Sequence, residues 1–220
     1  MPDTDDRVEL HEEVREVTQE EGQQDAGLLA DPKKASEGVL DDEDPAEFQE
    51  SELRAAEETV LADDEDEGEA AAGPPISRHL RRALQLGVSQ KGIRETPPGS
   101  NCQIYSTYFG FGCQFWCADF VSYCLDRTGN KDKKVPWGYP SAVANINAWG
   151  QRHGLIHSTP RKGDIFTRRD NMHTGFVLSA QGSSFMTIEG NTSGPTGDVY
   201  VASHSRDASS GMYFFVRHHF

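Results

Sequence analysis

The sequence predicts an α+β domain over residues 76–220, preceded by a mostly disordered acidic segment over residues 1–75. Two observations lead to this prediction. Apolar residues recur at helical spacing up to about residue 152, and after Pro160 they follow the shorter period of strands. Helices followed by consecutive strands are typical of α+β domains, in which the sheet is antiparallel.

The charge divides the chain at the same place. Residues 1–75 contain 27 Asp and Glu against 5 Lys and Arg, a net charge of −22. Residues 76–220 contain 9 acids and 16 bases, a net charge of +7, which gives −15 for the whole chain. Phe48 is the one aromatic residue of the acidic segment, so the segment lacks the apolar surface that would offset its ordering entropy. We expect a solvated tail or tether, with no more than transient helices at 8–20 and 46–61.

Three helices are predicted at the start of the domain. The first covers residues 77–91, is capped by Ser77, and has an apolar face. The second covers residues 117–125, where apolar side chains follow the i, i+3, i+4, i+7 pattern. The third covers residues 141–152. Residues 92–112, rich in Gly and Pro, are expected to form a loop.

Five strands follow, separated by turns of Gly, Ser, Asn and Asp. They are expected at residues 164–167, 173–179, 185–189, 199–203 and 212–217. No apolar run is long enough to cross a bilayer, and the first residues lack the pattern of a secretory signal. We therefore expect that the protein does not insert into a membrane and that it is made in the cytoplasm. If the protein works outside a cell, it would leave by lysis, in a phage particle or by a non-classical export route.

The polar residues of the domain suggest nucleophilic chemistry. Cys117 begins the second helix, whose positive end favours a thiolate. His173 stands at the head of a strand, and Glu189 and Asn191 follow at the end of the next one. A thiol with an imidazole and an orienting carboxylate is the residue set of a cysteine hydrolase.

The segments around these residues closely resemble the CHAP family of cysteine, histidine-dependent amidohydrolases and peptidases. The resemblance covers roughly residues 80–217 and is specific as an ordered set. Its segments are residues 94–101 (RETPPGSN), 116–122 (WCADFVS), 160–165 (PRKGDI), 173–175 (HTG) and 188–192 (IEGNT). It implies a papain-like fold that cleaves amide bonds of bacterial peptidoglycan, as in phage lysins and secreted cell-wall hydrolases.

The resemblance also implies a role for each residue of the site. Cys117 matches the nucleophile and His173 the general base. Glu189 matches the acid that orients the imidazole, and Asn191 matches a fourth polar position. For the oxyanion we expect the backbone amide of Cys117, with Gln114 as a candidate side-chain donor.

Two questions on function stay open. The bond cleaved is either the N-acetylmuramoyl–L-alanine amide or a peptide bond of the stem or cross-bridge. The rival function is a non-catalytic or assembly-mounted structural component of a phage or injection machine, with the acidic segment as its docking handle. We expect no cofactor and no nucleic-acid partner. We also expect no metal, because residues 100–116 contain no acid and the cysteines lack C-x-x-C spacing.

The remaining cysteines and aromatic residues allow alternatives. Cys102 and Cys113 either form a disulfide, which pairs loop with loop, or stay reduced. Cys124 is interpreted as a core residue and His204 as a histidine outside the catalytic set. The aromatic rings of residues 137 and 139 either line a substrate groove or pack in the core.

Overall fold

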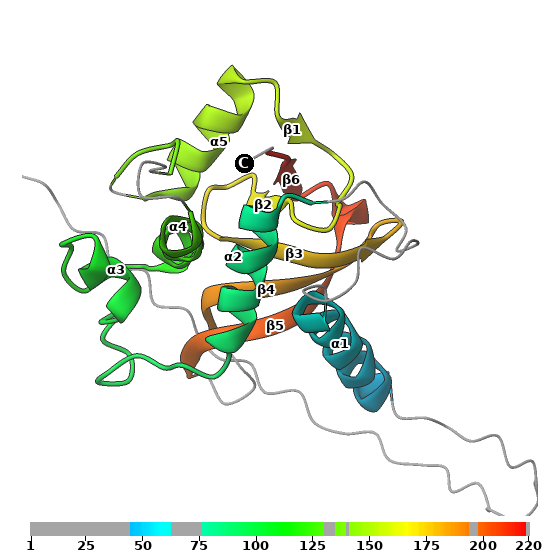
Figure 1. Ribbon diagram of the computed structural model, residues 1–220, viewed down its shortest axis with the longest axis horizontal. Coiled ribbons are helices and arrows are strands. Elements are labelled where there is room, and N and C mark those ends of the chain that lie inside the picture. The colour runs from blue at the N-terminus through cyan, green and yellow to red at the C-terminus, as the bar shows by residue number, and fades with distance from the viewer. Residues whose placement is uncertain (1–44, 63–75, 130–134, 140, 194–197, 219–220) are drawn as a thin grey trace, which may run out of the picture. The chain divides into compact units, whose positions relative to one another are not determined.

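The computed structural model describes residues 45–62, 76–129, 135–139, 141–193 and 198–218. Helices precede an antiparallel sheet of six strands, so the predicted α+β class is confirmed (Figure 1). The helices are α1 (Pro45–Ala62), α2 (Arg78–Ser89), α3 (Ile104–Tyr108), α4 (Cys117–Thr128) and α5 (Val143–Arg152). The helix expected at 8–20 lies outside the described residues.

The strands are β1 (Ile156–His157), β2 (Ile165–Arg168), β3 (Thr174–Gln181), β4 (Ser184–Ser193), β5 (Val199–Asp207) and β6 (Tyr213–Val216). They lie in the order β1-β6-β2-β3-β4-β5, with every neighbouring pair antiparallel. A short 3-10 helix, η1 (Ala208–Ser210), connects β5 to β6. The β3-β4-β5 meander carries most of the candidate site, while β6 inserts between β1 and β2.

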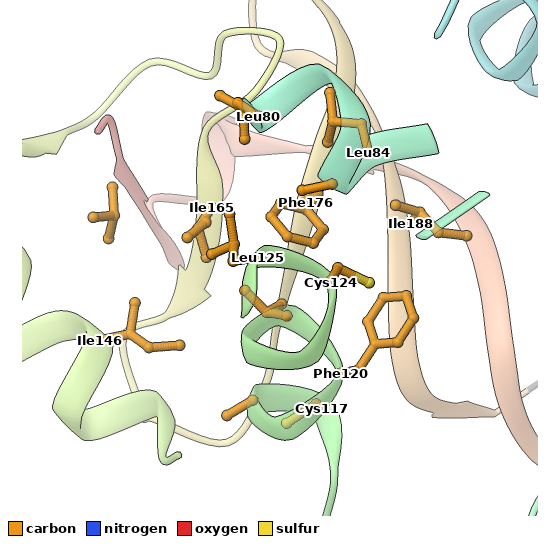
Figure 2. Close-up of a cluster of buried hydrophobic side chains, with 14 of the residues drawn as sticks. Leu80, Leu84, Cys117, Phe120, Cys124, Leu125, Ile146, Ile165, Phe176 and Ile188 are labelled. Carbon is orange, nitrogen blue, oxygen red and sulfur yellow. The ribbon is translucent and has the colours of Figure 1, made fainter. Parts of the chain in front are cut away.

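The main core lies between the helices and one face of the sheet (Figure 2). The apolar stripe of α4 includes Phe120 and Leu125, and it packs beside Phe176 and Ile188 of the sheet. Cys124 belongs to this stripe and is fully buried, as expected of a core residue. The core therefore fixes α4, and with it the position of Cys117, against the strands.

The other face of the sheet has a smaller apolar cluster. Its four buried members are Phe166, Val177, Phe185 and Phe215. Because successive strand residues point to opposite faces, Glu189 shares the Phe185 face of β4. The carboxylate thus comes from the side of the sheet that faces away from the main core.

Helix α1 lies where we expected at most a transient helix over residues 46–61, and it contributes to the core. Ala56 and Val60 are buried and join the main cluster, with α2, β3 and β5 as neighbouring elements. The Glu57 carboxylate accepts hydrogen bonds from Lys91 Nζ at 2.6 Å and from Ser203 Oγ at 2.5 Å. A short apolar stripe and one bridging carboxylate are enough to dock a helix of otherwise acidic composition.

Two short elements were not predicted. Helix α3 is a single turn whose first N–H is capped by the Gln103 side chain, and it lies within the expected loop 92–112. Strand β1 has only two residues, too few to show a period.

The cap at Ser77 is present, since its hydroxyl accepts a hydrogen bond from Leu80 N at 3.1 Å. Among the described residues, no helix is long and apolar enough to span a bilayer.

Candidate active site

Cys117 is the first residue of α4, and its side chain is 6% exposed. The preceding residue, Trp116, is fully buried, and its Nε1 donates a hydrogen bond to Glu95 Oε1 at 2.9 Å. This contact anchors the chain where the helix begins. The thiol lies at the N-terminal end of α4, which is the positive end of the helix dipole.

His173 lies directly before β3 and contacts both other members of the predicted triad. Its Nε2 forms a hydrogen bond of 2.6 Å with Glu189 Oε2, and the Cys117 side chain is close enough to the imidazole to raise the pKa of His173. Since Nε2 faces the carboxylate, Nδ1 is the nitrogen that serves the thiol. The structure therefore brings Cys117, His173 and Glu189 together in the predicted order of contact.

The environment of His173 favours the imidazolium. Burial alone would lower its pKa, but the hydrogen bonds to Cys117 and Glu189, together with their charges, raise the pKa to about 9. A neutral imidazole would leave the buried carboxylate of Glu189 with less counter-charge. The geometry thus stabilises a protonated His173 beside the thiol.

Glu189 is completely buried and fully hydrogen-bonded. Oε2 accepts from His173 and from Arg206 Nη2, and Oε1 accepts from Arg206 Nε and Thr187 Oγ1, the last three at 2.5 Å. Burial would raise its pKa, but the hydrogen bonds from His173 and Arg206 and their positive charges lower the pKa to about 2. Glu189 is therefore a carboxylate at any pH at which the protein would work.

Asn191 reaches the site through an irregularity in β4. The register between β4 and β5 shifts between Glu189 and Thr192, and Asn191 takes a φ of 54°. Gly190, the residue before it, lies against α4. A Cβ on Gly190 would lie 2.5 Å from Phe120 Cβ, so the glycine allows β4 to approach α4 closely.

The candidate site opens into a pocket of about 580 Å³. Cys117, His173 and Asn191 line it together with the large apolar side chains of Phe115 and Met172. Phe115 is 77% exposed and Met172 is 69% exposed, so both stand at the rim. The pocket therefore joins a polar reacting centre to an apolar entrance.

Two hydrogen-bond networks hold the walls of the pocket. Ser141 Oγ donates to Ser122 Oγ at 2.7 Å, which ties the wall before α5 to α4. Asn147 Nδ2 donates to Asn171 Oδ1 at 2.6 Å, and Thr167 Oγ1 donates to Asn147 Oδ1. This second network connects α5 to the turn that precedes His173.

A disulfide joins Cys102 to Cys113, with the two Cα atoms 4.2 Å apart. It closes the loop that contains α3. On one side of the bridge, Asn101 N donates to the buried Glu95 carboxylate at 3.0 Å. On the other side, Gln114 N donates to Asn101 O at 3.1 Å. The bridge thus ties together the two chain segments that form the wall next to Cys117.

Gln114 does not take the position that we expected. Its Nε2 donates to the buried carboxylate of Asp119 at 2.7 Å, and its side chain does not line the pocket. Asp119 lies in the first turn of α4 and accepts a second hydrogen bond from Ser106 Oγ at 2.7 Å. Ser106 of α3 and Gln114 therefore both hold Asp119 of α4, and of the two expected oxyanion donors only Cys117 lies at the pocket.

The aromatic candidates for a groove also differ from each other. Trp137 is buried, donates to Ser122 Oγ at 3.0 Å and packs against Trp149, so it belongs to the core. Tyr139 is partly exposed and stacks on Phe109, away from the residues that line the pocket.

His204 lies on β5, where its Nε2 is 2.9 Å from Thr192 Oγ1. Burial lowers its pKa, and the charges of Arg206 and His173 lower it further against the opposing effect of Glu189. Although it lies near the site, its ring binds Thr192 rather than the carboxylate.

Sequence reasoning missed Arg206 and Glu95. Arg206 lies near the end of β5, and nothing in the strand pattern separates it from a solvated arginine. Glu95 lies in the segment 94–101, which contributed to the family resemblance but was not assigned to the site. Because a buried carboxylate needs partners, looking for a cation on the strand next to Glu189 would have identified Arg206.

One of the comparisons with known proteins gives a match. The family described as CHAP domain matches residues 107–191, which include Cys117, His173, Glu189 and Asn191. No curated protein matches the chain, and no solved structure does.

Proposed function

From the CHAP domain that this chain carries over residues 107–191, we propose that the protein hydrolyses an amide bond of bacterial peptidoglycan. CHAP domains are generally cysteine, histidine-dependent amidohydrolases or peptidases. The observation that supports the proposal best is the contact series from Cys117 through His173 to Glu189, with Cys117 and His173 lining one pocket. Each of the three has a polar partner suited to its role.

The first half of the proposed reaction forms an acyl-enzyme. The Cys117 thiolate attacks the carbonyl carbon of the bound amide, and the resulting oxyanion accepts a hydrogen bond from the Cys117 backbone amide. His173, protonated at Nδ1, gives that proton to the leaving nitrogen. The C–N bond breaks, the amine departs, and a thioester to Cys117 remains.

The second half returns the thiol. His173, now neutral, takes a proton from water as the water oxygen attacks the thioester carbonyl. The C–S bond then breaks, the new carboxylic acid leaves, and the proton on His173 restores the resting pair. Throughout the cycle Glu189 holds Nε2 and stabilises the imidazolium without itself accepting the proton.

Two bonds of the wall fit this reaction equally well. One is the amide between the muramoyl group and L-alanine, and the other is a peptide bond in the stem or the cross-bridge. Both present a carbonyl flanked by aliphatic and polar groups to a pocket with an apolar rim. The choice between them is left to the experiment.

The test is mass spectrometry of the fragments that the protein releases from purified walls. An amidase yields stem peptides with a free L-alanine amine and glycan without peptide, whereas an endopeptidase yields muropeptides cut within the peptide. Cys117→Ala should release neither. Cys124→Ala is the matched control, because it removes a buried thiol two turns along the same helix. Fragment release by Cys117→Ala at the parent rate would disprove the proposal, and no release by the parent would favour a structural role.

A further inference from the structure

We infer that Arg206 is a positioning residue of the active site, which holds the Glu189 carboxylate in the orientation that His173 requires. The inference rests on the proposed function for its catalytic meaning. The coupling between Arg206 and the His173 imidazole can be measured without a cell-wall substrate.

The contact between Arg206 and Glu189 is bidentate. Nε donates to Oε1 and Nη2 donates to Oε2, each at 2.5 Å, in the parallel geometry that fixes the plane of a carboxylate. Fixing this plane directs Oε2 toward His173 Nε2, which lies 2.6 Å away. A point charge in the same place would neutralise the carboxylate without setting its orientation.

The guanidinium is itself held in place. On β5 Arg206 pairs with Phe185 of β4, so its side chain extends along the sheet to reach Glu189. Its Cζ lies over the Phe166 ring, 5.4 Å from the ring centroid. Tyr213 is close enough to contribute to the raised pKa of the guanidinium. With its side chain only 22% exposed, Arg206 is fixed from three sides.

The other titratable groups near Glu189 do not replace this function. His173 is the group being positioned, and Cys117 meets Glu189 only through His173. Burial lowers the pKa of His204, and its ring is directed to Thr192 rather than to Glu189. Among the described residues that bond to Glu189, Arg206 is the one with a permanent positive charge.

A purely structural role is the alternative, since Arg206 also ties β5 to β4. The chain offers a matched control for it. Arg217 makes the same bidentate contact with the buried Asp164, at 3.0 Å from Nε to Oδ1 and 2.8 Å from Nη2 to Oδ2. Arg217 directly follows β6 and Asp164 directly precedes β2, so this pair lies away from β4 and β5, and its carboxylate bonds to Arg217 and Arg161 rather than to His173. Loss of Arg217 therefore reports the cost of breaking such a pair away from the site.

The experiment follows the alkylation of Cys117 by iodoacetamide across a pH series. Peptide mass spectrometry separates Cys117 from the buried Cys124, whose thiol has a pKa raised by burial and serves as the unreactive reference. Parent, Arg206→Met, Arg206→Lys and Arg217→Met are compared. Arg206→Gln, which keeps an N–H donor, is a second neutral variant should the methionine variant fail to fold.

Without the guanidinium, Glu189 takes up a proton more easily. The acidic limb, which is the fall of the Cys117 alkylation rate toward low pH, should therefore move to higher pH by about one unit or more. In Arg206→Lys the limb should shift less than in the neutral variants, because lysine keeps the positive charge but lacks the two parallel N–H donors of the guanidinium. Arg217→Met should lower the unfolding midpoint and leave the limb unchanged. An unshifted limb in a folded neutral variant would overturn the inference. This result is independent of wall cleavage, so it is distinct from a failure of the proposed function.

Discussion

Gly175 of β3 leaves the space that the Glu189 side chain occupies. A Cβ built on Gly175 would lie 2.8 Å from Glu189 Cγ and 2.8 Å from the Phe166 ring. No buried side chain accommodates contacts that short without moving. The glycine two residues after His173 is thus a steric requirement for the carboxylate to reach the imidazole.

Gly175→Ala should displace Glu189 and lower the rate of amide hydrolysis on the order of 100-fold, the cost of misplacing a catalytic group by about 1 Å. Fragment release from purified walls measures this rate. Gly112→Ala is the control, because a Cβ there meets nothing within 4 Å. A Gly175→Ala variant that is folded and as active as the parent would contradict the steric argument.

The ion pair between His173 and Glu189 should make the free energy of unfolding depend on pH. The pKa of His173 is raised from 6.5 to about 9, so its contribution to stability is complete below pH 6.5 and is lost as the pH rises through 9. The pKa of Glu189 is lowered from 4.5 to about 2, so its contribution is complete above pH 4.5 and is lost as the pH falls toward 2. Both contributions are present together between pH 4.5 and 6.5.

Urea unfolding at a series of pH values measures this dependence. Between pH 6.5 and 9 the free energy of unfolding should fall more steeply for the parent than for His173→Gln, in which the titrating imidazole is absent. Equal slopes for the two proteins would show that His173 does not carry a raised pKa in the folded state.

The disulfide between Cys102 and Cys113 should be detectable as two missing thiols. Under non-reducing denaturation, protein exposed to a mild oxidant should show two thiols, those of Cys117 and Cys124. Replacing both bridge residues with alanine should lower the free energy of unfolding by about 2–4 kcal/mol, because the unfolded chain regains the freedom of the loop. A count of four thiols would contradict the bridge.

The apolar rim should contribute to substrate binding rather than to chemistry. Phe115→Ala together with Met172→Ala should raise the wall concentration needed for half-maximal rate about tenfold, with the maximal rate largely kept. Ile104→Ala is the control, because Ile104 is also an exposed apolar residue but does not line the pocket. A fall in the maximal rate alone would assign the two side chains to the reacting centre instead.

Helix α1 should protect its part of the chain from proteolysis. Val60 is completely buried, and Val60→Asp would place an unpaired carboxylate in the core, so α1 should detach and become cleavable. Thr59→Asp, one residue earlier on the exposed side, should leave it protected. Limited proteolysis followed by mass spectrometry locates the cuts. Equal cleavage of α1 in the parent and in Val60→Asp would show that the helix is not docked.

Much of the fold follows from residue spacing. The stripe of α4 and the cap at Ser77 are local patterns, and the structure has both where they were expected. The order of Cys117, His173 and Glu189 also pointed to one site, because residues at neighbouring strand ends come close in an antiparallel sheet. Such features depend on short stretches of chain whose period is visible in the sequence.

The features that were missed depend on contacts between distant segments. Arg206 meets Glu189 from another strand, and α1 docks through two small apolar side chains that an acidic composition conceals. Gln114 was expected at the oxyanion, but its side-chain amide instead donates to the buried Asp119 carboxylate, which also accepts a hydrogen bond from Ser106. Each of these contacts depends on which residues are buried, and the sequence alone does not show this.

The position of β6 in the sheet has a consequence for biosynthesis. This strand lies between β1 and β2, which precede it in the chain by more than forty residues. A nascent chain that has emerged only as far as β5 has its thiol, imidazole and carboxylate, yet β2 still has an open edge. Completion of the sheet therefore waits for the segment from Tyr213 to Val216 to leave the ribosome, and a chain cut short before Tyr213 exposes an unpaired strand prone to aggregation.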